Sequence, residues 1–161
     1  MKSKRETIGW WIAIGLLPIV GFTGIAIWVY GYSYRFRSFR NDFAASIASA
    51  QGSGRMTAVC DGVTTRITRD NADYIHREIT GGEHYGYAKE APEGACVELD
   101  FGNGDAMTIW PGEGGTEEGL TVRYCTYRGK EVIVEIGNDA RYENIRRLVS
   151  EQWGNEVVKD E

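Results

Sequence analysis

Three cysteines and two histidines are the residues of this 161-residue chain best suited to covalent or metal chemistry. Cys60, Cys96 and Cys125 form no CxxC pair, and His76 and His84 do not complete a spaced set of zinc ligands with them. A cysteine–histidine nucleophile pair could be assembled from these residue types, but no local motif around them indicates one. The sequence therefore predicts no catalytic residue, no metal ligand and no cofactor.

A disulfide is the second chemistry open to the cysteines. Cys96 and Cys125 both lie on the polar face of an expected strand, so their side chains can meet if the two strands are neighbours. A Cys96–Cys125 disulfide requires an oxidising compartment, whereas three reduced thiols fit the cytoplasm. Both alternatives stay open at this point.

Two expected loops carry the residues that we interpret as candidates for binding. Residues 83–94 show no hydrophobic period and present Tyr85 and Tyr87. Residues 112–119 are glycine-rich and acidic, and their candidate residues are Glu113, Glu117 and Glu118. These glutamates would repel phosphate, so the glycines do not indicate a phosphate-binding loop.

Acidic residues also gather near a turn over residues 100–105. Carboxylates converging from neighbouring loops are the ligands that Ca²⁺ prefers. The EF-hand spacing is absent, however, and the sequence Gly-Asn-Gly-Asp at 102–105 is a favourable hairpin turn. We therefore interpret this segment as a turn rather than a metal site.

A domain over residues 55–154 must position these side chains. Asp61-Gly62 between two β-rich runs predicts a hairpin over 55–68. The remaining pattern predicts a helix over 71–80, strands over 95–101 and 106–110, a hairpin over 120–136 and a helix from about 139 to 153. The order β-β-α-β-β-β-β-α predicts a two-layer α+β domain, with two helices on a mostly antiparallel sheet. Residues 155–161 are expected to be a frayed tail.

Residues 31–54 are expected to form a juxtamembrane helical stalk followed by a hinge. Apolar residues at positions 32, 36, 39, 43, 47 and 50 recur at helical spacing, and Gly52-Ser53-Gly54 ends the pattern. Three alternatives stay open for this helix: docking on the domain, lying in the membrane interface, or self-association.

The stretch from Ile8 to Tyr30 is 23 residues long and carries no charge. A helix of this length rises about 1.5 Å per residue, enough to cross a hydrocarbon core of about 30 Å. The expected interface anchors at its ends are Trp10, Trp11, Trp28 and Tyr30. Residues 1–7 form a short basic tail, and no small-residue cleavage site follows the apolar run. We therefore predict an uncleaved transmembrane helix.

Charge is distributed unevenly along the chain. Residues 1–40 carry a formal charge of +5, whereas residues 41–161 carry −10. An acidic domain disfavours nucleic acid as a partner. The basic tail favours the cytoplasmic side, although arginines on the other flank nearly balance it. We expect the domain to be extracytoplasmic.

From these features we expect a non-enzymatic, single-pass membrane protein that presents a small acidic domain. We expect an assembly or scaffold subunit of a membrane complex, whose partners are the lipid bilayer and either another protein or further copies of the chain. Two alternatives are a membrane-anchored ligand-binding or sensing domain and a membrane-tethered hydrolase.

Overall fold

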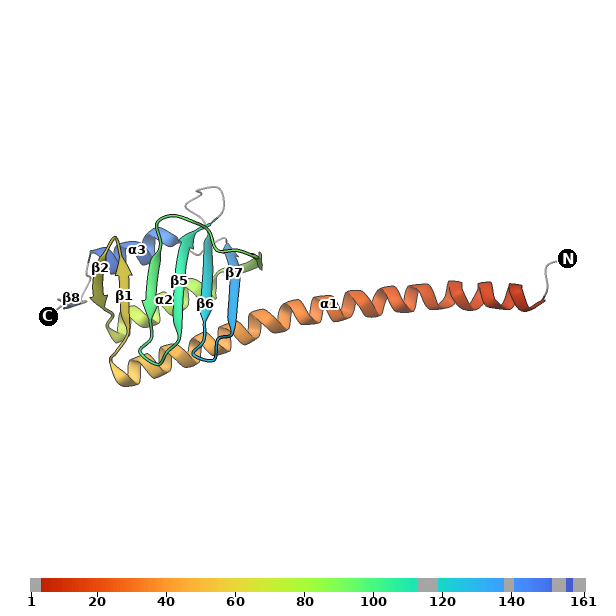
Figure 1. Cartoon of the computed structure of the whole chain (residues 1–161), viewed down its shortest axis with the longest axis horizontal. Helices are drawn as coiled ribbons and strands as arrows, with labels where there is room; N and C mark the ends of the chain where they lie inside the picture. The colour runs from red at the N-terminus through yellow and green to blue at the C-terminus, as the bar shows by residue number, and fades with distance from the viewer. Residues whose placement is uncertain (1–3, 113–118, 138–140, 152–155, 158–161) are drawn as a thin grey trace. The chain divides into compact units, whose positions relative to one another are not determined.

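The structure is a computed structural model that describes residues 4–112, 119–137, 141–151 and 156–157, with side chains from residue 18 onward except at 85, 156 and 157. The chain divides into two compact units, residues 1–38 and 39–161. The larger unit is an α+β domain with an eight-stranded antiparallel sheet (Figure 1).

One helix, α1 (Lys4–Ser53), contributes to both units. In the smaller unit, residues 18–30 are exposed on every side of the helix, including Phe22, Ile25 and Trp28, whose exposed fractions are 75%, 61% and 69%. Two aromatic pairs, Trp28 with Tyr32 and Tyr30 with Tyr34, stack one helical turn apart. Among the residues whose side chains are described, from residue 18 onward, no helix is both long enough and apolar enough to cross a membrane.

The strands follow the order β3-β7-β6-β5-β4-β1-β2-β8 across the sheet. Every pairing is antiparallel, and hairpin turns join β1 to β2, β4 to β5 and β6 to β7. The strand bounds are β1 (Thr57–Cys60), β2 (Val63–Arg66), β3 (Glu83–Tyr87), β4 (Val97–Asp100), β5 (Ala106–Pro111), β6 (Leu120–Cys125), β7 (Glu131–Gly137) and β8 (Glu156–Val157).

The two shorter helices, α2 (Arg69–Gly81) and α3 (Tyr142–Ser150), contact each other, and α3 packs on β1, β2 and β5. Helix α2 buries Ala72, Ile75 and Ile79, which share one face at helical spacing. Burial alternates along β4, where Val97 and Leu99 are buried while Glu98 and Asp100 are exposed. This alternation defines the face of the sheet that forms the core.

The end of α1 belongs to the core of the domain. Phe39 and Phe43 are almost fully buried, and both rings meet Tyr124 edge-on at centroid distances of 5.8 and 6.3 Å. Phe43 also contacts Phe101 at 5.9 Å. Ile47 and Ala50 continue the same buried face. Of the alternatives considered for this helix, residues 39–50 therefore dock on the domain.

The expected order of elements lacks two strands that the structure contains. Residues 83–87, which we expected to be part of a loop, form β3, and Glu156 and Val157, which we expected in a frayed tail, pair with β2. Both strands are short, and they lie at the two ends of the sheet. A strand in this position can form without the alternating apolar residues by which a strand is recognised in a sequence. Helix α3 also begins and ends about three residues inside the expected range.

Candidate binding edge of the sheet

Strand β3 is the terminal strand of the sheet and contains Tyr85 and Tyr87, two of the candidate binding residues. It pairs with β7 on one side, and no described strand pairs with its other side. The register shifts between His84 and Gly86, which is a β-bulge. A terminal strand of a sheet is a position at which an extended segment of another chain can pair.

His84 gives this edge a defined local shape. Its Nε2 atom lies 2.9 Å from the carbonyl oxygen of Gly86, and its ring meets the Tyr87 ring at a centroid distance of 4.6 Å. Burial lowers the pKa of His84, while the contact with the Gly86 carbonyl acts in the opposite direction. His84 is therefore a packing residue of the edge that favours the neutral form.

The base of the acidic loop lies at the same end of the sheet as the start of β3. Gly112 donates a backbone hydrogen bond to the Gly119 carbonyl at 3.1 Å. Gly119 adopts a φ of +117°, and a side chain there would come within 3.1 Å of the Ile136 carbonyl. Ile136 precedes Gly137, which pairs with Glu83. The predicted binding residues Glu113, Glu117 and Glu118 lie outside the described residues.

A cavity of about 500 Å³ lies beside the second half of α2, the helix that precedes β3 in the sequence. Its lining residues are Tyr74, Arg77, Glu78, Gly81 and Gly82. Within it, the Tyr74 hydroxyl donates to Glu78 at 2.7 Å, and the Asn144 amide donates to the same oxygen at 3.0 Å. Burial and the neighbouring Glu78 carboxylate raise the pKa of Tyr74 to about 12. The cavity therefore offers a neutral phenol, a carboxylate and a guanidinium to a small polar ligand.

A second polar group, which sequence reasoning interpreted only as part of a turn, lies inside the domain. Asp105 is 7% exposed and accepts hydrogen bonds from Ser46, from Asn103 at 3.0 Å, from Tyr124 at 3.3 Å and from the Tyr127 backbone amide at 2.8 Å. The Ser46 and Tyr124 hydroxyls lie 2.9 Å apart. Because the group is buried and its partners are internal, it ties α1 to the sheet and is closed to a substrate.

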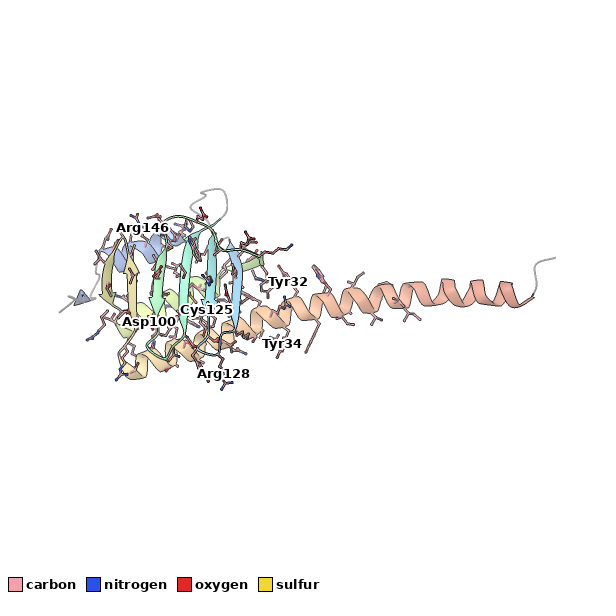
Figure 2. All side chains as sticks on the ribbon, viewed as in Figure 1. Tyr32, Tyr34, Asp100, Cys125, Arg128 and Arg146 are labelled. Carbon is pink, nitrogen blue, oxygen red and sulfur yellow. The ribbon has the colours of Figure 1, made fainter. Side chains whose placement is uncertain are left out.

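The cysteines do not meet in the predicted way. Cys125 lies at the end of β6 (Figure 2). Cys96 lies just before β4, and β5 separates the two strands. The register places Cys125 opposite Ala106, whereas Val97 is opposite Ile109. The two cysteines are thus offset by about 13 Å along the strands, too far for a disulfide. All three thiols are free.

The thiols of Cys60 and Cys96 also lack the lowered pKa of an activated nucleophile. Burial raises the pKa of Cys60, and the adjacent Asp61 raises it further, although Arg146 opposes this. Burial and Glu98 raise the pKa of Cys96. Within the described part of the chain, no three His, Cys, Asp or Glu side chains gather closely enough to hold a metal ion.

The predicted membrane-interface residues fall in the smaller unit. Trp28 and Tyr30 are 69% and 74% exposed. The side chains of Trp10 and Trp11 lie outside the described residues.

Searches for similar proteins found no matching family model, no matching curated protein and no matching solved structure.

Proposed function

We propose that this chain is a single-pass membrane protein whose acidic α+β domain binds another protein at the β3 edge, as an assembly or scaffold subunit. The observation that carries the membrane part is the apolar surface of α1 over residues 18–30, where no face is buried. Exposed side chains of this kind are unfavourable in water and favourable in lipid. The uncharged sequence continues toward the N-terminus as far as Ile8.

The interaction part rests on the character of the β3 edge. A terminal strand is a position where an extended partner segment can add to a sheet, and residues 83–94 carry carboxylates at positions 83, 90 and 93 against a single lysine at 89. Charge complementarity selects a partner with a basic extended segment. The buried state of Ser46, Asp105 and Tyr124 supports an interaction role over a catalytic one.

Membrane insertion is tested by extracting membranes with alkaline carbonate. We expect the full chain to stay in the pellet and to dissolve only in detergent. A matched variant with Ile19→Asp and Ile25→Asp should lose this resistance, because each buried charge is costly in the bilayer core. Release of the unmodified chain by carbonate, or its recovery as a water-soluble oligomer, would show that other copies and not lipid cover the apolar helix.

Partner binding is tested with a photo-crosslinking amino acid at Tyr87, using Tyr127 as the matched control. Tyr127 lies in the β6–β7 turn, at the end of β7 opposite to Gly137 and the start of β3, and is 63% exposed. We expect a crosslinked protein at position 87 that is absent at position 127 and is weakened by the charge reversals Glu90→Lys and Glu93→Lys. Equal crosslinking at both positions, or none at position 87, would exclude the β3 edge.

A second candidate function is a membrane-anchored ligand-binding domain, favoured by the 500 Å³ cavity beside Tyr74 and Glu78. A thermal-shift screen with small polar ligands checks it. A ligand-induced stabilisation that Glu78→Gln abolishes would favour sensing over assembly.

A further inference from the structure

The docked end of α1 is held from two directions. Toward the sheet, Ser46 joins the buried hydrogen bonds of Asp105 and Tyr124. Toward α2, the Phe43 ring lies 5.2 Å from the His76 ring, and Gln51 donates to Asp73 at 2.6 Å. The contact of α1 with α2 thus includes a group that can change its charge near neutral pH.

The packing between α1 and α2 is incomplete at the end of α1. A cavity of about 300 Å³ lies there, and its lining includes Ala50, Gln51, Met56, Ile67 and Ala72. The lining also includes Arg66, Thr68 and Arg69, and the last turn of α1 reaches α2 through the hydrogen bond from Gln51 to Asp73. The Phe43–His76 ring contact therefore joins α1 to α2 alongside the Gln51–Asp73 hydrogen bond.

The charged groups around His76 come from both helices. Arg40 acts on it from α1, and Asp73 acts on it from its own helix. Phe43 covers the ring from α1, and Phe101, which follows β4, contacts Phe43 from the sheet side without adding a charge. The histidine is half-buried.

We propose that residues 39–50 of α1 form a strap whose docking on the domain weakens when His76 is protonated. Protonation places a second positive charge opposite Arg40 and requires water around a ring that the closed strap covers. Opening the strap relieves both effects. The proposal concerns the domain alone and does not depend on membrane attachment.

The direction of the pH effect follows from the surroundings of His76. Burial lowers its pKa below the ordinary value of 6.5, Arg40 lowers it further, and Asp73 opposes them. A group with a lowered folded-state pKa favours the closed state above its unfolded pKa, and this contribution is lost as the pH falls through the folded value. Strap docking is therefore strongest at neutral and alkaline pH and weakens below about pH 6.5.

Hydrogen exchange of the full chain in detergent micelles tests the proposal. Protection of the 39–50 amides, corrected for the intrinsic pH dependence of exchange, should fall by about twofold or more between pH 7.5 and 5. His76→Gln should remove this dependence. The matched control is His84→Gln, because His84 is the only other histidine in the chain and lies in β3. It should keep the dependence.

A second measurement covers the case in which His76→Gln perturbs folding. Titration of the His76 ring by NMR should give a pKa below that of a free histidine, and Arg40→Gln should move it upward. Arg40 is exposed, so this substitution should not disturb the core. Protection that does not change with pH, dependence that persists in His76→Gln, or a pKa unaffected by Arg40→Gln would overturn the proposal.

Discussion

Asp105 shows how one residue can have a role that its sequence neighbours do not reveal. The Gly-Asn-Gly-Asp motif correctly predicts a hairpin turn between β4 and β5. The carboxylate, however, also binds Ser46, which is 59 positions earlier, and Tyr124, which is 19 positions later. Contacts between residues so far apart depend on the packing of α1 against the sheet. A hydrophobic pattern reports which face is buried but not which polar groups meet there.

Removing the charge of Asp105 should destabilise the domain. Asp105→Asn weakens several hydrogen bonds to a buried anion, and we expect the free energy of unfolding to fall by about 2 kcal/mol. Urea denaturation measures this change. Glu98→Gln, at an exposed position on β4, should change the unfolding free energy by less than about 0.5 kcal/mol. Equal losses for the two variants would contradict the assigned role.

Acid should weaken the domain through the same residue. Burial alone would raise the pKa of Asp105, but the hydrogen bonds from Ser46, Tyr127, Asn103 and Tyr124 hold it below its ordinary value of 3.8. The stabilisation is therefore complete above that value and disappears as the pH falls through the lower folded-state pKa. Unfolding curves of the unmodified chain and Asp105→Asn should converge at low pH. Parallel curves down to pH 2 would exclude this linkage.

The elements that could be predicted from the sequence are those that turn residues or hydrophobic spacing determine locally. Asp61 and Gly62 adopt φ values of 51° and 77°, as a two-residue hairpin turn requires, and they join β1 to β2. The buried face of α2 likewise follows from the spacing of Ile75 and Ile79. Strand β3 was missed because, among the described strands, it pairs with β7 alone, and because its register shifts between His84 and Gly86. The candidate binding edge could therefore be identified only from the pairing of the strands in the structure.

The turn between β4 and β5 supplies a prediction at this scale. Gly102 has a φ of +70°, and a side chain there would lie 2.6 Å from the Cβ of Arg55. Gly102→Ala should therefore lower the thermal midpoint more than Gly129→Ala. Gly129 has a similar φ of +75°, but its added Cβ meets open space. The first substitution carries backbone strain and a clash, and the second carries strain of about 1 kcal/mol. A larger loss for Gly129→Ala would contradict this packing.

At the scale of the whole molecule, an apolar, basic N-terminal segment is followed by an acidic domain. Residues 1–40 combine an apolar helix with a formal charge of +5, and residues 41–161 form an acidic domain with a formal charge of −10. The apolar segment motivates the membrane proposal, and the terminal strand β3 of the domain motivates the proposal of partner binding. The sequence predicts a helix on both sides of Gly31, over residues 8–30 and within 31–54, and the structure joins them as the single helix α1 (Lys4–Ser53).

The most direct test of the account is cysteine labelling of intact cells with a membrane-impermeant maleimide, in a background where Cys60, Cys96 and Cys125 are alanine. Single cysteines are placed at Ser3 in the basic tail and at Tyr127 in the exposed β6–β7 turn. The account predicts labelling of Tyr127→Cys in intact cells and of Ser3→Cys only after lysis, since the two positions lie on opposite sides of the bilayer. Labelling of both positions under the same condition would contradict a single-pass helix between them.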